Sequence, residues 1–380
     1  MPQHVVRLIS SHPGVAADPL VDLAAGPLAV RSRRLTGGRR EGVLLVELVA
    51  GATKVFVLPD RGLGIWKVFA GGVELGWQSP VAGPVHPTFV PQAEPSGLGW
   101  LDGFDELVAR CGLVSNGAPD FDASGRLAHG LHGRIANLPA HELTVTLDDD
   151  AGTLTLEGAV DETRFLIHAL RMETRLVLAA DRPRIAWTDT VTNISERPTT
   201  MQLLYHVNFG PPLLGAGAQV LAAIDELAPR DAVAVPDVAT WNRYDAPRPG
   251  RGEDVHFARI RPNADGVASA LLVAPDGSQA AGLSWTADTL PCFTLWKNQG
   301  GLADGYVTGL EPATNYPNRR SFEEAQGRVV SLAPGQRVRF DLALEHLTGE
   351  RLAAARTAIT ALAAAPPKVH AQPRPGWSVG

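Results

Sequence analysis

Three polar clusters in the sequence each adjoin an apolar, strand-like run, and their side chains are of the kinds that transfer protons or bind hydroxyl groups. The first is "HGLHGRIANLPAH" (129–141), which contains three histidines, an arginine and an asparagine. The second is "LLYHVNFGPPLL" (203–214), where His206 and Asn208 interrupt an apolar run. The third is "GLEPATNYPNRR" (309–320), which contains Glu311. A polar ring inside an apolar strand needs a partner, so His206 is a candidate functional residue.

A carboxylate and an imidazole that face one small polar ring can carry out acid/base chemistry without a cofactor. One group takes the proton of a hydroxyl while the other gives a proton to a ring oxygen, which is what the opening of a sugar hemiacetal requires. Neighbouring Arg, Asn, Lys and Trp side chains would bind the sugar hydroxyls and cover the apolar face of the ring. We expect Glu311 and His206 to lie roughly 5 to 8 Å apart, by analogy with other acid/base pairs that flank a sugar.

The first cluster also has structural interpretations. A histidine beside glycine in a turn is commonly a hydrogen-bonding residue of the loop, which is the role expected for His129 and His141. Arg134 and Asn137 could cap the backbone of the same loop. His129 and His132 are spaced i, i+3 without a following carboxylate, which is a weak metal-binding pattern. The sequence therefore predicts neither a metal nor a cofactor.

Composition excludes several classes of protein. The chain has 380 residues, 45% of them hydrophobic and 19% charged, which is typical of a globular protein. A net charge of −6, with one basic segment at Arg31–Arg40, argues against a nucleic-acid partner. We expect that segment to be a solvated turn between strands. The two cysteines, Cys111 and Cys292, have neither disulfide-framework nor zinc-site spacing.

No window reaches the 18 or more apolar residues of a membrane span, and the first residues lack the apolar stretch of a signal peptide. The sequence therefore predicts a soluble, cytoplasmic protein without a membrane partner.

Strand patterns cover most of the chain. In "RVRFDLALEHL" (337–347) apolar residues alternate with charged ones, as in a half-buried strand. Similar runs are separated by DDDAG, ADRP, SERP and PDGS turn sequences. Many short strands joined by polar turns favour an antiparallel sandwich or barrel over βαβ units.

Two helices are expected. "TGERLAAARTAITALAAAPP" (348–367) has apolar residues on one face, a capping residue in Thr348 and two prolines that end it. A shorter helix is expected at "GFDELVARCG" (103–112). No linker or repeat divides the chain, so we expect one domain over 1–380, with its core at about 40–348 and a C-terminal helix and tail at 349–380.

The motifs together resemble the aldose 1-epimerase (galactose mutarotase) superfamily. His132-Gly133 resembles its early His-Gly motif, "YHVNF" (205–209) its "NHxYFN" segment and "EPATNYPN" (311–318) its "ExQNYPD" segment. The run "RVVSLAPGQRVRF" (328–340) is similar to its closing strand, and 51–77 to its opening strands. The resemblance covers roughly 45–348. Three further segments, "LHGRIANLPA", "WLDGFDELVARCGL" and "LYHVNFGPPL", are similar to a branch labelled only epimerase-like or of unknown function.

This resemblance implies an all-β fold, an antiparallel two-sheet β-supersandwich with a few short helices. It also implies an isomerase that interconverts the α and β anomers of a free sugar, with His206 as general acid and Glu311 as general base. The substrate would be a small-molecule sugar, and the chain would act as a monomer or a homodimer. The side chains expected to bind the sugar are His132, Arg134, Asn137, Asn208, Trp296 and Lys297.

The sequence also departs from the superfamily pattern. Tyr205 stands where the galactose enzymes carry Asn, and "HGRIANLPA" replaces their "HGGxxG". The substrate-binding Asp has three candidates, Asp245, Asp254 and Asp304. Lys297 could replace lost hydroxyl contacts or bind an acidic sugar. Two alternative functions remain: a lyase that acts by β-elimination on an oxidised sugar or glycoside, and a non-catalytic carbohydrate-binding protein.

Overall fold

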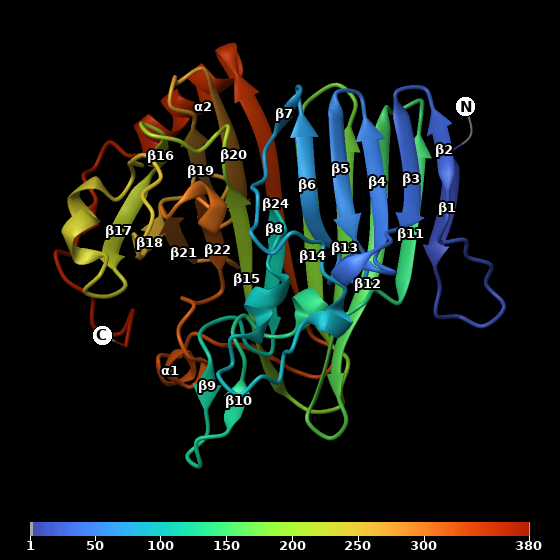
Figure 1. Cartoon of the computed structure of the whole chain (residues 1–380), viewed down its shortest axis with the longest axis horizontal. Helices are drawn as coiled ribbons and strands as arrows, with labels where there is room; N and C mark the ends of the chain where they lie inside the picture. The colour runs from blue at the N-terminus through green and yellow to red at the C-terminus, as the bar shows by residue number, and fades with distance from the viewer. Residues whose placement is uncertain (1–2, 380) are drawn as a thin grey trace.

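The computed structural model describes residues 3–379, and within this range strands dominate. They form two large sheets that pack face to face, with the blue strands in front of the green ones in Figure 1. The smaller sheet has nine strands, in spatial order β1 (His4–Ile9), β11 (Glu142–Asp148), β12 (Thr153–Arg164), β13 (His168–Ala179), β14 (Arg184–Asn193), β24 (Arg337–Thr348), β20 (Gln279–Thr286), β19 (Val267–Val273) and β16 (Gln219–Ala222).

The larger sheet positions the candidate site. Among the described residues it has fourteen strands: β2 (Asp22–Ala25), β3 (Leu28–Arg34), β4 (Leu44–Ala50), β5 (Thr53–Leu58), β6 (Gly64–Ala70), β8 (Val108–Leu113), β15 (Thr199–Phe209), β22 (Val307–Ala313), β21 (Cys292–Asn298), β18 (Glu253–Ile260), β17 (Ile224–Pro229) and β25 (Lys368–Val369), with β7 (Val73–Glu74) beside β6 and β23 (Val330–Leu332) beside β15. A separate hairpin is formed by β9 (Asp120–Phe121) and β10 (Leu127–His129). Of these strand pairs only β17 with β25 is parallel, so the predicted all-β antiparallel fold is confirmed.

Alternation of apolar side chains explains why these residues form strands. In β24, Phe340, Leu342 and Leu344 are buried while Arg337 and Arg339 are exposed. The buried faces of both sheets meet in one core, where Val46 and Val55 from the larger sheet join Leu154, Leu176 and Leu344 from the smaller one. The two sheets are therefore held together by a continuous apolar layer.

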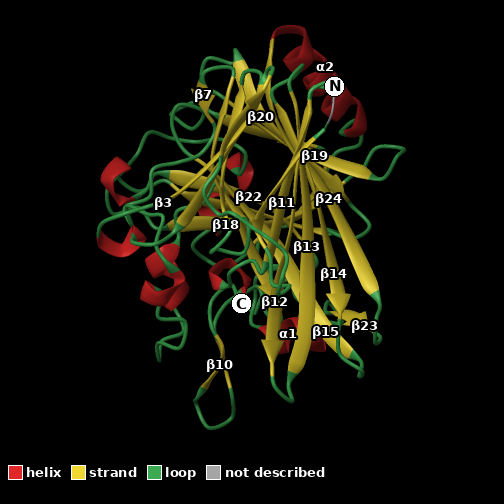
Figure 2. Cartoon of the chain, turned by 90° about the vertical axis from the view of Figure 1, so that its right-hand side faces the viewer, coloured by secondary structure: helices red, strands yellow, loops and turns green. Residues whose placement is uncertain are grey.

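Helices lie around the edges of the strands (Figure 2). The C-terminal helix α2 (Gly349–Leu362) is confirmed, and its Leu352 and Ile359 pack with Leu347 of β24. Thr348 occupies the N-cap position, although its side chain makes no capping hydrogen bond. The other helical segments are α1 (Arg320–Ala325) and the short 3-10 turns Gly38–Arg40, Pro87–Phe89, Gly99–Gly103, Ile135–Asn137, Val235–Thr240 and Leu302–Asp304.

The helix predicted at 103–112 is wrong. Only a 3-10 turn ends at Gly103, and the segment continues into β8, which pairs with β6 and β15. All six residues of β8 are buried, because one face meets the core between the sheets and the other is covered by loops. The basic segment Arg31–Arg40 is an exposed end of β3 followed by a turn, as predicted. None of the helices within residues 3–379 has the length and apolar character needed to traverse a bilayer.

Candidate active site

His206 lies near the end of β15, on the face of the larger sheet that points away from the core between the sheets. Tyr205 and Val207 belong to that core, whereas Leu204 packs with the loops that cover the opposite face. Successive side chains of a strand alternate between faces, so His206 and Asn208 share the loop-covered face with Leu204. His206 is only 5% exposed.

Glu311 reaches the same face from the neighbouring strand β22. The antiparallel register places Val207 opposite Leu310, which brings His206 and Glu311 across from one another. The Nε2 atom of His206 lies 3.3 Å from Oε1 of Glu311, and the carboxylate is 2% exposed. The expected spacing of 5 to 8 Å is therefore wrong: the two groups are in direct contact.

Aromatic rings surround the imidazole of His206. The ring centroid of Phe104 lies 4.9 Å away, that of Trp296 5.2 Å and that of His132 5.3 Å. These residues line a cavity of about 520 Å³, which is large enough for a small-molecule ligand. The same cavity is lined by Trp77, Trp100, Arg230, Glu253, Thr294, Asp304 and Glu311.

Burial shifts the two acid/base groups in opposite directions. It raises the pKa of Glu311 well above its usual value, and the nearby carboxylate of Glu253 raises it further, whereas Arg230 lowers it. Burial also lowers the pKa of His206 well below its usual value, with a further contribution from His132. Both shifts favour the uncharged forms, because a poorly solvated site penalises charge.

Asn208 holds the imidazole of His206 from behind. Its Nδ2 donates to the backbone oxygens of Glu106 and His206, so its Oδ1 is left to accept from Nδ1 of His206 at 2.6 Å. This contact fixes a proton on Nδ1 and leaves Nε2 free for chemistry on the side of Glu311. Asn208 is buried and does not line the cavity. The prediction that it binds sugar is therefore wrong, and its role is to orient the imidazole of His206.

Asn137 also belongs to the structure behind the site. Its Oδ1 accepts from the buried guanidinium of Arg61 at 2.8 Å, and Arg61 is paired with the buried carboxylate of Glu106. The backbone oxygen of Glu106 in turn accepts from Asn208 and from Trp77 Nε1. The prediction that Asn137 binds sugar is therefore wrong, since its amide oxygen accepts from Arg61 and the residue does not line the cavity.

His132 does line the cavity. Its φ of 57° is in the left-handed region, and Nδ1 lies 2.9 Å from the backbone oxygen of Asn116, which requires a proton on Nδ1. Burial lowers the pKa of His132 to about 4. The following Gly133, at φ 69°, has no room for a side chain, because a Cβ would lie 2.0 Å from the oxygen of Ser115. The His-Gly motif thus makes the turn that presents this ring.

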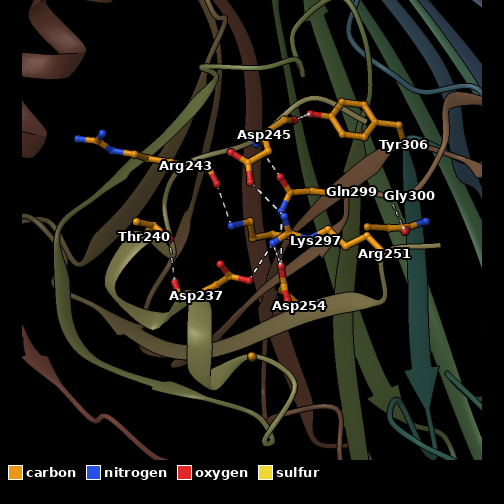
Figure 3. A network of polar contacts seen from close by, with 12 residues as sticks. Asp237, Thr240, Arg243, Asp245, Arg251, Asp254, Lys297, Gln299, Gly300 and Tyr306 are labelled. Carbon is orange, nitrogen blue, oxygen red and sulfur yellow. Dashed lines mark hydrogen bonds and ion pairs between the residues drawn. The ribbon is translucent and has the colours of Figure 1, made fainter. Parts of the chain in front are cut away.

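Trp296 and Lys297 are adjacent on β21 and therefore point to opposite faces. Trp296 lines the cavity and its Nε1 donates to Glu253 at 2.8 Å. Lys297 instead donates from Nζ to the backbone oxygen of Arg243, 2.8 Å away, within the polar network of Figure 3. Its predicted contact with sugar is wrong, because strand alternation separates it from the cavity.

The network in Figure 3 also contains two of the three candidate aspartates. Arg251 pairs with Asp245, Asp254 and Asp237, and neither Asp245 nor Asp254 lines the cavity. Asp304 does line it. It is the remaining candidate for a substrate-binding aspartate.

Arg134 lies outside this cavity as well. It lines a second cavity together with His129, so His132 and Arg134 do not point into one pocket as expected. The local reason is that Gly133, at φ 69°, turns the chain between His132 and Arg134. Within residues 3–379 no cluster of three or more His, Cys, Asp or Glu side chains is arranged to hold a metal ion.

Several cavity residues are missing from the predicted site. Trp77, Trp100 and Phe104 come from loops that cover the larger sheet, and Arg230 pairs with Glu253 at 2.9 Å near the rim. The only sequence signal for the three aromatic residues is their position beside glycines in "LGW" and "GWLDGF". Such loops carry no periodicity from which the direction of a side chain can be read.

Comparison with solved structures identifies proteins of similar fold. A Klebsiella pneumoniae protein provisionally described as an aldose 1-epimerase superposes with a TM-score of 0.91 at 29% identity, covering 97% of each chain. A galactose mutarotase-like protein from Clostridium acetobutylicum superposes with a TM-score of 0.57 at 15% identity, and the match covers 86% of this chain and 100% of the other. An Escherichia coli protein, also provisionally described as an aldose 1-epimerase, superposes with a TM-score of 0.53 at 17% identity. The match covers 80% of this chain and 99% of the other. No curated protein sequence matches.

The fold is galactose mutarotase-like, and the likeness to the Klebsiella pneumoniae protein places the chain in the aldose 1-epimerase superfamily. Within it, the chain belongs to the family described as a domain of unknown function, DUF4432, whose profile matches residues 40–346.

Proposed function

We propose that this protein is an aldose 1-epimerase, an isomerase that interconverts the α and β anomers of a free sugar. The observation that carries the proposal is the contact of His206 Nε2 with Glu311 Oε1 at 3.3 Å, at the wall of a cavity of sugar size. A carboxylate and an imidazole in contact can transfer protons together. Burial disfavours charge on both groups and so favours the state in which the pair holds one proton.

The close contact suits ring opening better than a wide spacing would. Carboxylates 5 Å or more apart flank a glycosidic bond and act from its two sides. In a free sugar, the C1 hydroxyl and the ring oxygen are bonded to the same carbon, so the two reacting oxygens are neighbours. Two catalytic groups in contact can therefore each reach one oxygen of a sugar whose C1 edge approaches the pair.

One proton shared by the pair is enough for the full cycle. When His206 carries it, Glu311 takes the C1 hydroxyl proton and His206 gives its proton to the ring oxygen. The ring opens to the aldehyde and the proton now resides on Glu311. Rotation about the C1–C2 bond follows. As the ring closes on the other face, Glu311 returns its proton to the carbonyl oxygen and His206 takes back the proton of the attacking hydroxyl. An acid or base group held in position raises the reaction rate by roughly 10²- to 10⁴-fold.

Other cavity residues would bind the rest of the sugar. Trp296 and Trp100 offer apolar faces for the C–H side of the ring, and Thr294 has a buried hydroxyl without a partner among the described residues. The Nε2 atom of His132 is free to accept from a hydroxyl because Nδ1 faces the oxygen of Asn116. Asp304 would add a further acceptor.

The charges in the cavity favour a neutral sugar. Its arginine, Arg230, is already paired with Asp231 and Glu253, and Lys297 points to the other face of the sheet. A uronate carboxylate would therefore find no unpaired cation here among the residues that line the cavity. This argues against the lyase alternative, since elimination from an oxidised sugar needs its carboxylate neutralised.

Initial-rate polarimetry on freshly dissolved neutral aldoses, with uronic acids in the same panel, tests the proposal. We expect faster relaxation of optical rotation with at least one neutral aldose and no formation of an unsaturated product. Absorbance that develops with a uronic acid or glycoside would support the lyase instead. Sugar binding without any acceleration would support a carbohydrate-binding protein.

A further inference from the structure

A second cavity, of about 540 Å³, lies beside the candidate active site. The two cavities share Trp100 and Leu131 as lining residues. The second cavity is bounded by the end of the β12–β13 hairpin, by β10 and by the loop segments around 92–100 and 114–115. None of the acid/base residues contributes to it.

Buried polar atoms without partners line this second cavity. Within residues 3–379, no hydrogen-bond partner is present for Gln92 Oε1, Trp100 Nε1 or Ser115 Oγ, and His168 Nε2 has only the carboxylate of Glu162, 4.0 Å away. Ser115 is 1% exposed and the His168 side chain 10%. Buried polar atoms in native proteins nearly always have hydrogen-bond partners, so several atoms without one around a single cavity indicate a polar ligand. They include donors and acceptors, which matches hydroxyl groups because these do both.

Positive charge also collects at this cavity. Arg134 and Arg164 line it, are exposed, and form no ion pair with another residue of the described chain. Burial lowers the pKa of His168, and the two arginines lower it further, as expected in a positive potential. The one carboxylate among the lining residues is Glu162. Burial raises its pKa to about 7, so it is partly uncharged near neutral pH.

We propose that this second cavity binds a hydroxylated small molecule that carries a carboxylate or phosphate group, as sugar acids and sugar phosphates do. Arg134 and Arg164 bind the anionic group at the rim, since guanidinium groups match both kinds of anion. Ser115, Gln92 and the indole N–H of Trp100 bind its hydroxyls inside. The inference does not depend on the proposed anomer interconversion, because it uses neither His206 nor Glu311.

Calorimetric titration of the full chain tests the site with four probes: D-glucuronate, D-glucose 6-phosphate, D-glucose and inorganic phosphate. We expect at least one of the two anionic sugars to bind about tenfold or more tightly than D-glucose. The stronger of the two identifies the anionic group. Arg134→Gln and Arg164→Gln should each weaken that binding by about 10- to 100-fold, since hydrogen bonds to charged groups are worth about 1.5 to 3 kcal/mol.

Matched variants separate this site from the active site. Arg134→Lys keeps the charge and should retain more affinity than Arg134→Gln, while Glu311→Gln should leave anion binding unchanged. If Arg134→Gln does not fold, Arg164→Gln at the exposed rim carries the same test. Anion binding that is lost in Glu311→Gln but kept in both arginine variants would overturn the proposal.

Two further outcomes would also overturn it. Inorganic phosphate that binds as tightly as the anionic sugars would exclude a hydroxylated ligand, and no anion binding at all would exclude the site. Polarimetry of Arg134→Gln distinguishes the two proposals. If this variant loses anion binding but still interconverts anomers at an unchanged rate, the anion site and the active site are different cavities.

Discussion

The carboxylate of Glu311 occupies the space that a side chain at Gly309 would need. A Cβ at Gly309 would lie 2.3 Å from Oε1 of Glu311 and 3.2 Å from Cε1 of His206. The two positions are on one face of β22, two residues apart, and the glycine leaves the carboxylate room to turn toward the imidazole. The contact between Glu311 and His206 therefore requires glycine at position 309.

Gly309→Ala is therefore expected to impair catalysis. The methyl group must displace the carboxylate, and a misplacement of about 1 Å costs roughly 10²-fold in rate. The free energy of unfolding should change little, because the atom displaced is the end of the flexible Glu311 side chain. Initial-rate polarimetry and thermal unfolding measure the two effects. Gly252→Ala is a matched control, because its nearest neighbour would be Val233 at 4.0 Å. Equal rates in both variants would contradict the positional role of Gly309.

Glu311→Gln should abolish proton transfer while preserving the size of the side chain. We expect kcat to fall by roughly 10²- to 10⁴-fold with little change in sugar affinity, because other residues bind the hydroxyls. His206→Asn should behave similarly, and the double variant should be scarcely slower than either single one, since both groups serve one step. Turnover like that of the wild type in Glu311→Gln would refute the mechanism.

The pH profile of kcat/KM should be bell-shaped. The active pair carries one proton, so activity falls at alkaline pH when that proton is lost from Glu311, whose pKa is raised by burial. Activity falls at acid pH when His206, whose pKa is lowered by burial, takes a second proton. The acid limb thus reports His206 and the alkaline limb Glu311, the reverse of the order of their ordinary pKa values near 4.3 and 6.5, and each limb belongs to the pair. Rates measured from acid to alkaline pH would contradict this if they fell on one side only.

Lys297→Met should leave the KM for sugar unchanged and reduce stability. The ammonium group of Lys297 donates to the oxygen of Arg243 and lies 5.1 Å from the ring of Tyr244, on the face opposite the cavity. Loss of a buried charged donor is expected to cost about 1 to 3 kcal/mol of unfolding free energy. Chemical denaturation and polarimetry measure the two quantities. A large rise in KM at unchanged stability would place the lysine in the sugar site after all.

The sequence predicts the fold and the position of His206 for one physical reason, whereas the role of Glu311 rests on the resemblance to the superfamily. Strand alternation is a local property, so β24 and the polar interruption at His206 can be read without knowledge of their neighbours in space. Alternation also explains the error at Lys297: adjacent residues of a strand face opposite sides, so Trp296 and Lys297 could not both line the cavity. Only the pairing of β21 in the sheet decides which of them does.

The rest depends on loops and on tertiary contacts. The spacing of Phe104, Leu107, Val108 and Cys111 fits a helix, yet these residues form a turn and a strand buried on both faces. Arg134 and Asn137 follow His132 closely, but the turns at Gly133 and Ile135–Asn137 direct one into another cavity and the other toward Arg61. No period in the sequence encodes such turns.

Trp100 is a single indole that forms part of both cavities, with its ring centroid 4.5 Å from that of His132. A ligand that moves this ring in one cavity changes the shape of the other. Thermodynamic linkage then requires reciprocity: whatever factor an anion imposes on the dissociation constant of the sugar, the sugar imposes on that of the anion. The indole would act as the coupling element between them, and its intrinsic fluorescence would report occupancy from either side.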